Sequence, residues 1–376
     1  MKQSVIVACM LGFCMNFLFS EVVNQDRPLN GQWDFHPQRI WVVDEAGPDL
    51  FGEIQNLAVD HSQKVFVADQ KHSAVFIFDS RGRFLKRFGK QGEGPGEIRR
   101  FFGGEQLYVV GDKVLFADRT VLHYFDIDGN YLKSVRFAAT LKPRAFIDEH
   151  TFVSAPATVD RSSNEPSRIL VVDLYTGKRV PIADFSPFEK ASSTKQSAGQ
   201  QMTVAIVIGD ITPLMLVHAA NNRIYYGMSD TYRLHICDLA GNAIAAFSIP
   251  DRKPCPVSDA FKKELAGNLG DVPANFLKNI MDGLPPHASF FSAIHVDKNG
   301  NIYLFESNPD SRSKKHVDIF NSKGEYIHRA ALEAETGESI DAILMGDGFV
   351  LMATEDEDGT VKLAKYAIQL PGPAKP

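Results

Sequence analysis

The sequence predicts an all-β fold in which one four-strand unit repeats along the chain. Residues 57–89 show the unit most clearly, as four short runs rich in β-branched and aromatic residues, each closed by Gly, Asp or Ser. The runs begin at Leu57, Val65, Val75 and Phe84. With 44% hydrophobic residues and 27 phenylalanines, the chain can form a substantial core, so wholesale disorder is excluded.

The turn after the third strand sets the register of the repeat. Residues 78–82 read FDSRG, and the pattern returns as FDIDG at 125–129, CDLAG at 237–241 and FNSKG at 320–324. It also returns with one extra residue, as VDLYTG at 172–177. Asp or Asn caps such a turn through its own side chain, and Gly supplies a positive φ. The motif therefore predicts an antiparallel hairpin between the third and fourth strands.

Six copies of the unit can be counted from the first hairpin, whose opening strands begin near residues 57, 107, 146, 216, 294 and 342. The sixth copy has only three strands, while a strand-like run at 40–44 precedes the first copy and occupies the sequence slot of a fourth strand. Pairing the two chain ends would close a ring and remove exposed sheet edges. The prediction is a six-bladed β-propeller with four-stranded antiparallel blades, the last completed by the N-terminal strand.

The four-strand unit, the Asp-x-x-Gly turn and the joint GEGPGE at 92–97 resemble bacterial exported six-bladed β-propellers of the NHL-repeat type. The resemblance covers about residues 33–370, with residues 371–376 as a tail, and it implies the fold while saying almost nothing about activity. The third unit departs most from the pattern, because its Gly is offset and no Asp follows its second strand.

Two insertions interrupt the repeat. Residues 185–203 are polar and predict a loop. Within 251–289, Ser258 can cap a helix over 259–265, and Pro273 can open a second helix over 274–282. Phe276 and Ile280, together with Leu277 and Met281, fall on one face of that second helix.

Propeller connectivity places both insertions and the blade joints on one face of the disc, around the mouth of the central channel. Loops held by a rigid scaffold favour binding, so this face is the candidate binding face. Its candidate binding residues are Glu93, Gly94, Pro95, Gly96, Glu97, Phe276 and Ile280. The alternatives are a stiff Gly-Pro joint at 92–97 and plain packing of the helix on a blade rim, or a lid over the channel.

Four acidic residues follow or lie close to second strands: Asp69, Asp118, Asp230 and Glu306. Acidic groups ringing the mouth could hold Ca²⁺, which takes oxygen ligands from several loops, as in propeller lactonases and esterases. Alternatively, each acidic residue caps its own turn. Ca²⁺ is thus a candidate cofactor, and no other cofactor is predicted.

The predicted function is binding of a protein, peptide or glycan partner through the insertion-bearing face. The alternative is a metal-dependent hydrolase or lyase with its site at the channel mouth, and a third class is a structural spacer. HExxH, CxxC, GxSxG and phosphate-loop patterns do not occur in the sequence. A net charge of −6 without a basic run argues against a nucleic-acid partner.

The first twenty residues have a basic start at Lys2, an apolar stretch from Ser4 and a small residue at Ser20. This pattern predicts a cleaved signal peptide over 1–20, and hence a periplasmic or extracellular protein with no transmembrane segment in the mature chain. An uncleaved anchor is the alternative, and lipidation at Cys9 or Cys14 is disfavoured by the residues around them. Outside this segment, Cys237 and Cys255 could form a disulfide or be two buried thiols.

Overall fold

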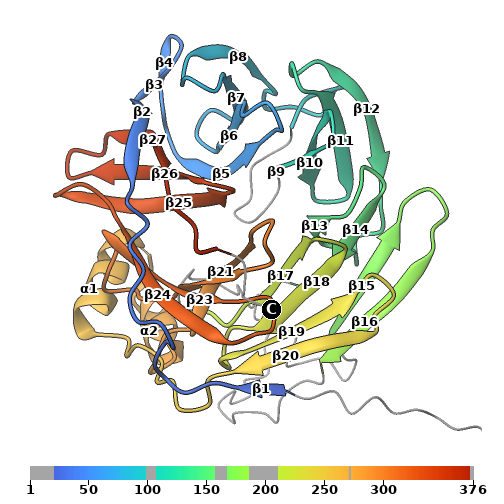
Figure 1. Cartoon of the computed structure of the whole chain (residues 1–376). Coiled ribbons are helices and arrows are strands. Elements are labelled where there is room, and N and C mark those ends of the chain that lie inside the picture. Colours follow the sequence, from blue (N-terminus) through green and yellow to red (C-terminus); the bar gives the residue numbers. More distant parts are fainter. Residues whose placement is uncertain (1–20, 99–106, 157–166, 186–210, 271, 373–376) are drawn as a thin grey trace, which may run out of the picture.

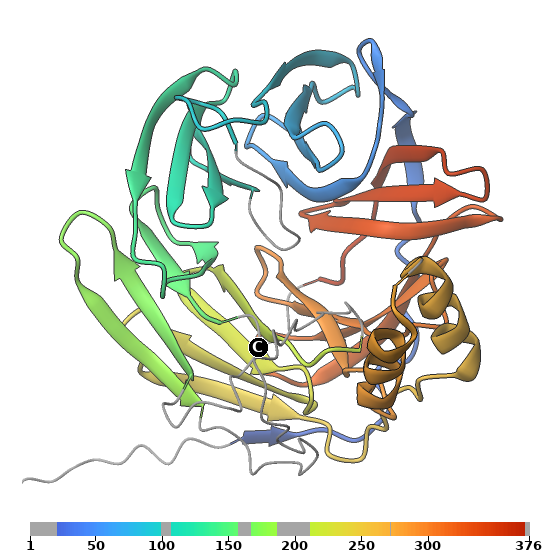
Figure 2. The same cartoon turned by 180° about the vertical axis from the view of Figure 1, so that it is seen from behind.

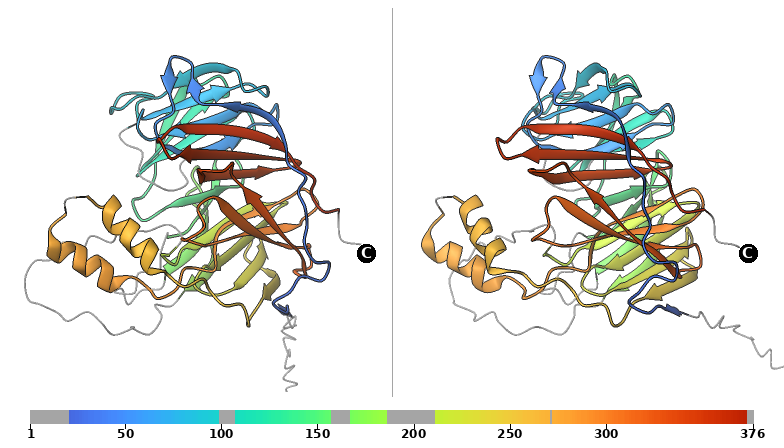
Figure 3. Two further views of the ribbon diagram at one scale, coloured as in Figure 1. Left: turned by 90° about the vertical axis from the view of Figure 1, so that its left-hand side faces the viewer. Right: turned by 60° about the vertical axis from the view of Figure 1, so that its left-hand side comes forward.

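The computed structural model describes residues 21–98, 107–156, 167–185, 211–270 and 272–372. Six blades, each with four antiparallel strands, are arranged around a central axis, as predicted (Figure 1). The predicted signal peptide and most of the predicted loop at 185–203 lie outside the described residues, and Phe185 itself ends a strand. The helices α1 (Asp259–Asn268) and α2 (Ala274–Gly283) stand out from one face of the disc (Figures 2 and 3).

Each blade runs outward from a channel-lining first strand. Blade 1 contains β5 (Ile54–Val59), β6 (Val65–Asp69), β7 (Ala74–Phe78) and β8 (Phe84–Phe88). Blade 2 contains β9 (Leu107–Val110), β10 (Lys113–Asp118), β11 (Val121–Asp126) and β12 (Tyr131–Arg136). Blade 3 contains β13 (Pro143–Phe146), β14 (Thr151–Ser154), β15 (Ser167–Asp173) and β16 (Arg179–Phe185).

The second half of the ring repeats this order. Blade 4 contains β17 (Met215–Ala220), β18 (Arg223–Met228), β19 (Arg233–Asp238) and β20 (Ala243–Ser248). Blade 5 contains β21 (Phe291–Val296), β22 (Ile302–Glu306), β23 (Lys314–Phe320) and β24 (Tyr326–Glu333). Blade 6 contains β25 (Glu338–Gly346), β26 (Phe349–Asp356), β27 (Val361–Ala367) and, as its outer strand, β2 (Gln38–Val43).

Strand β6 shows why the inner strands are apolar on both faces. Val65 and Val67 pack into the cluster that blade 1 shares with blade 6, whereas Phe66 and Ala68 pack into the cluster shared with blade 2. Successive side chains of a strand point to opposite faces, so each central strand contributes to two interblade layers. Six such layers, one between each pair of neighbours, form the core.

The ring is closed by β2, which pairs antiparallel with β27 as the N-terminal run predicted. Trp41 of β2 is 9% exposed and packs against Gly82 in the hairpin turn of blade 1. Its Nε1 donates to the carbonyl of Ser80 at 3.0 Å. Gly82 has φ +78°, and a Cβ there would lie 2.7 Å from the indole, so this turn requires glycine for both reasons.

The N-terminal segment also makes a strand pairing that was not predicted from the sequence. β1 (Glu21–Val23) joins blade 4 as a parallel fifth strand beside β20. The chain then follows the outer edge of blade 5, where the amide of Leu29 donates to the carbonyl of Tyr326 and that of Trp33 to Arg329. The segment therefore covers two outer edges before it enters blade 6. The short hairpin of β3 (Glu45–Ala46) and β4 (Asp49–Leu50) links β2 to blade 1.

Two local predictions differ from the structure in their bounds. The first strand of blade 3 was expected from Phe146 to Asp148, but it spans Pro143–Phe146, because Asp148 caps the following turn through the amides of His150 and Thr151. The first helix begins after its predicted cap, Ser258, whose Oγ accepts from the amide of Phe261, but it continues to Asn268 instead of ending at residue 265.

The base of the helical insertion is held by a buried ionic cluster. Asp318 of β23 accepts hydrogen bonds from the hydroxyls of Tyr232 and Tyr326 at 2.6 and 2.5 Å. It also pairs with Arg252 at 2.6 Å and with Arg329 at 3.2 Å. A buried carboxylate is tolerated only when it is paired and hydrogen-bonded in this way. Arg252 also pairs with Asp26, so one cluster joins the insertion, blade 5 and the N-terminal segment.

Cys237 and Cys255 are free thiols. Cys237 belongs to the layer between blades 3 and 4, whereas Cys255 packs beside Ile211, Val257 and Ala288 under the insertion. Burial raises the pKa of the Cys237 thiol to about 12 and that of Cys255 to about 11. The structure thus has the two-thiol alternative, not the disulfide.

We expect Trp41→Ala to lower the free energy of unfolding by about 3–5 kcal/mol, because it opens the layer between blades 6 and 1. Urea unfolding followed by circular dichroism measures the change. The neighbouring Ile40 is 52% exposed, so Ile40→Ala is the matched control and should cost less than about 1 kcal/mol. Equal effects of the two substitutions would contradict the closure argument.

Candidate functional site at the mouth of the central channel

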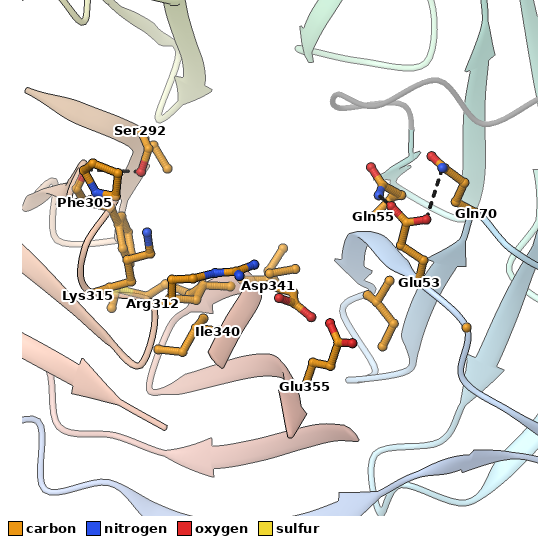
Figure 4. Close-up of a pocket in the computed structure, with 18 of the residues that line it drawn as sticks. Glu53, Gln55, Gln70, Ser292, Phe305, Arg312, Lys315, Ile340, Asp341 and Glu355 are labelled. Atoms are coloured by element: carbon orange, nitrogen blue, oxygen red, sulfur yellow. Dashed lines mark hydrogen bonds between the residues drawn. The ribbon is translucent and has the colours of Figure 1, made fainter. Parts of the chain in front are cut away.

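A large cavity opens on the face that carries α1 and α2. We call it the central pocket; its volume is about 1330 Å³. Its walls come from blades 1, 4, 5 and 6 and from α1, which contributes Phe261, Glu264 and Leu265. Figure 4 shows its polar side chains, which gather on two sides.

Bulges in the first strands turn polar residues toward this pocket. In β5 the pairing with β6 skips Gln55, in β21 the pairing with β22 skips Ser292, and in β25 the pairing with β26 skips Asp341. All three skipped residues line the central pocket. A bulge inserts one extra residue and re-aims its side chain, so these polar groups escape the alternation that buries their neighbours.

One side of the pocket is acidic. The Glu53 carboxylate accepts from Nε2 of Gln55 at 2.6 Å and from Nε2 of Gln70 at 3.1 Å, which holds it in place. Asp341 and Glu355 lie beside it (Figure 4). Burial, and then the charge of Glu355, raise the pKa of the Asp341 carboxyl to about 6.

Two basic residues come from the second turn of blade 5. Arg312 and Lys315 line the pocket, and the Arg312 side chain extends toward Asp341 (Figure 4), whose pKa the Arg312 charge lowers in part. The guanidinium of Arg312 pairs with the Glu264 carboxylate of α1 at 2.7 Å, which ties the helix to the pocket wall. A bound molecule would therefore meet both carboxylates and basic groups in the pocket.

The lining of the central pocket also includes two imidazoles, His218 of β17 and His295 of β21. Their ring centroids are 5.8 Å apart. Burial lowers the pKa of His218 to about 4 and that of His295 to about 3, so both rings are neutral at neutral pH. Within the described part of the chain, Nε2 of His295 is buried without a hydrogen-bond partner. Neutral imidazoles can donate or accept one hydrogen bond to a ligand.

The predicted binding residues of the 92–97 joint lie elsewhere. Glu93, Gly94, Pro95 and Glu97 line a second, smaller cavity of about 250 Å³, together with Asp118 from the predicted acidic ring. Glu97 closes its own loop, because it accepts from the amide of Gly94 at 2.8 Å and pairs with Lys90 at 2.8 Å. Gly96 has φ +75° and packs on Tyr131.

The predicted binding residues of the second helix are only partly covered. Phe276 and Ile280, with Leu277 and Met281, are half-buried, and neither helix has a buried residue. The apolar stripe of α2 therefore faces partly toward solvent at the rim of the binding face.

The structure does not bring the four predicted metal ligands together. Asp69 accepts from the amides of Gly52 and His72 at 2.7 and 3.0 Å, so it acts as a cap. Glu306 pairs with Arg329, and Asp230 lies in blade 4. Among the described residues, three or more Asp, Glu, His or Cys side chains nowhere gather in a way that could hold a metal ion. The calcium site remains a prediction.

The candidate site residues predicted from the sequence did not include four residues of the central pocket: Glu53, Asp341, Glu355 and Arg312. A weak signal existed for Glu53, because Gly52-Glu53-Ile54 repeats as Gly96-Glu97-Ile98 in the next joint. No sequence pattern indicated the bulge at Asp341.

We expect the Asp341 carboxyl to titrate near pH 6 and its pKa to fall in Glu355→Gln, because a neighbouring negative charge is removed. Carbon-13 NMR of the side-chain carboxyl measures this. Since the native pKa exceeds the ordinary value of 3.8, the folded state holds this proton more tightly, and stability falls as pH rises from about 4 to about 6. In Asp341→Asn, the loss of stability that this carboxyl causes between about pH 4 and pH 6 should disappear. A pKa near 4 would contradict the proposed geometry.

We expect Ca²⁺ to leave the thermal unfolding midpoint unchanged relative to excess EDTA, because Asp69 and Glu306 already have protein partners. Differential scanning fluorimetry measures the midpoint. A Ca²⁺-dependent rise, removed by Asp69→Asn and Glu306→Gln, would instead support the predicted metal site, since a ligand that binds the native state stabilises it by mass action.

Comparison with known proteins supports the fold. The family described as 6-bladed beta-propeller (DUF5128) matches residues 48–175. No curated protein sequence matches the chain. In the described residues, no helix is long and apolar enough to cross a membrane.

Two solved structures share the architecture. A Bacteroides fragilis protein assigned as exported is 12% identical, with 94% of this chain and 99% of that chain covered and a TM-score of 0.53. A Bacteroides vulgatus member of the DUF4221 family is 14% identical, with 89% and 98% covered and a TM-score of 0.55. At such identities the similarity shows the fold alone, and the chain is a six-bladed β-propeller.

Proposed function

We propose that this chain is an exported binding propeller that takes a peptide segment of a partner protein into the central pocket. The observation that carries the proposal is the set of bulged inner strands, which direct Gln55, Ser292 and Asp341 into one pocket. A bulge re-aims the side chain of its extra residue, and three of these polar side chains line one cavity, where a single ligand could contact all of them.

The size and chemistry of the pocket favour a peptide. Its volume of about 1330 Å³ exceeds the usual range for small-molecule sites, about 300–1,000 Å³. It combines carboxylates, basic groups and apolar residues such as Ile340 and Leu265. A peptide presents charged, hydrogen-bonding and apolar groups at once. A glycan site would more often present exposed Trp or Tyr rings, and among the described lining residues the Phe, Tyr or Trp side chains are Phe261 and Phe305.

The exposed part of the α2 stripe extends this surface. Because α1 lines the pocket and α2 packs beside α1, a partner that inserts a segment into the pocket would also meet the apolar side chains of α2. Apolar anchors beside a polar pocket are common in protein recognition.

A hydrolase or lyase activity is the second candidate, and one observation favours it. The Asp341 carboxyl, with its pKa near 6, lies beside the Glu355 carboxylate. Two neighbouring carboxyl groups with separated pKa values can divide the roles of general acid and general base. This candidate requires turnover of a bound peptide or glycan, which the binding proposal does not.

The test is selection of random displayed peptides on the immobilised chain, followed by fluorescence anisotropy of the selected peptides. We expect Asp341→Asn, Glu355→Gln or Arg312→Gln to weaken binding about tenfold or more, equivalent to about 1.4 kcal/mol. Lys323→Ala changes an exposed charge in a hairpin turn on the opposite face and should leave affinity unchanged.

Three outcomes would change the conclusion. Equal affinity for the wild type and all three pocket variants would overturn the central pocket as the site. Binding on a glycan array with no peptide selected would favour a glycan partner. Cleavage of a selected peptide, lost in Asp341→Asn, would establish the hydrolase candidate.

A further inference from the structure

The smaller cavity lies between blades 1 and 2, outside the central pocket. We call it the joint cavity. It is roofed by the 92–97 joint and walled by β10, β11 and β12, and its volume is about 250 Å³. The apolar layer between these blades, which includes the Phe88–Phe125 pair with ring centroids 4.5 Å apart, gives way here to polar side chains. The ionisable and hydroxyl groups that line it are Glu93, Glu97, Asp118, His123, Tyr131, Ser134 and Arg136.

A hydrogen-bonded chain runs along one wall of this cavity. His123 and Ser134 are direct cross-strand partners in β11 and β12. The Ser134 hydroxyl lies 3.0 Å from Nδ1 of His123, and the Tyr131 hydroxyl lies 2.9 Å from Ser134 Oγ. Register therefore fixes a serine hydroxyl within hydrogen-bonding reach of an imidazole.

The exposed fraction of the side chain decreases from Ser134 to His123 to Asp118. Ser134 is exposed, His123 is 7% exposed, and Asp118, at the end of β10, is 3% exposed. Burial lowers the pKa of His123, and the charge of Asp118 acts in the opposite direction. The ring is therefore neutral at neutral pH. With Nδ1 accepting from Ser134, the proton of the neutral ring lies on Nε2.

We propose that Ser134 and His123 form a nucleophile–base pair that hydrolyses small carboxylic esters in the joint cavity, which Asp118 also lines. An activated serine requires a base within about 2.6–3.2 Å, and the 3.0 Å between Ser134 Oγ and His123 Nδ1 meets that requirement. Such a constellation is recognised by geometry, not by sequence order or motif. The absence of a GxSxG pattern therefore does not exclude it.

The reaction balances without a cofactor. Ser134 Oγ bonds to the acyl carbon while His123 Nδ1 takes the hydroxyl proton, the ester C–O bond breaks, and the alcohol leaves with that proton. Water then bonds to the acyl carbon and gives a proton to His123. The acid departs as Ser134 Oγ recovers that proton. Tyr131 and Arg136 are donors that line the same cavity, and donors of this kind can stabilise a developing oxyanion.

The size of the cavity limits the substrate. A volume of about 250 Å³ holds a short acyl group but not a peptide. Activity at this site is therefore independent of peptide binding in the central pocket, and variants of Asp341 or Arg312 should not affect it.

The experiment is labelling of the purified chain with a fluorophosphonate probe, together with hydrolysis of p-nitrophenyl acetate. We expect one label per chain, located at Ser134 by mass spectrometry of the digest. Ser134→Ala should abolish labelling and lower the hydrolysis rate at least about 100-fold, the scale of general-base catalysis. Ser339→Ala, which removes a hydroxyl that contacts the Glu355 carbonyl at 3.4 Å and the Asp341 carboxyl, is the matched control and should label normally.

Asp118→Asn tests whether the buried carboxylate in the cavity wall acts on His123. Because the charge of Asp118 raises the His123 pKa, its removal should shift the midpoint of the labelling rate to lower pH, which a merely structural change would not do. His123→Gln should abolish labelling; since His123 is buried, thermal unfolding must first show that this variant is folded. Absence of labelling in the folded wild type, or labelling that persists in Ser134→Ala, would overturn the proposal.

Discussion

Packing of neighbouring blades is the interaction on which the whole structure depends. Each blade buries both of its faces only because another blade lies on either side, as the alternation of Val65, Phe66 and Val67 between two layers shows. An open row of six blades would leave two large apolar faces in water, at a cost of about 25 cal/mol per Å². Pairing of β2 with β27 removes that cost, and the N-terminal segment reinforces it by covering the edges of blades 4 and 5.

The closed ring tolerates β-bulges in its innermost strands. The bulges at Gln55, Ser292 and Asp341 lie in innermost strands, whose far edges face the channel, so one skipped residue disturbs a single ladder. The same rigidity supports the helical insertion. Asp318 in blade 5 holds Arg252 at the start of that insertion, which positions α1 beside the pocket.

The two cavities separate two kinds of chemistry. The central pocket is large, carries both carboxylates and basic groups and is suited to an extended, chemically mixed ligand. The joint cavity is small and carries a serine–histidine hydrogen bond between two strands. Both depend on polar side chains placed where a plain propeller would have apolar ones, and both lie at joints or turns of the elaborated face.

The sequence by itself determined the features that depend on local chemistry: the Asp-x-x-Gly hairpins, six units, the Ser258 helix cap and the closing N-terminal strand. These follow from side-chain capping, positive φ and alternation, which act over a few residues. The GEGPGE motif also indicated the joint at 92–97 as a candidate binding segment, but no sequence pattern indicated the cavity beneath it. Only the tertiary structure decided that Glu53, Asp341 and Arg312 share one pocket, that β1 joins blade 4, and that Ser134 faces His123. These contacts depend on bulges and on strand register. A register shift of one residue would turn each side chain to the other face of its sheet.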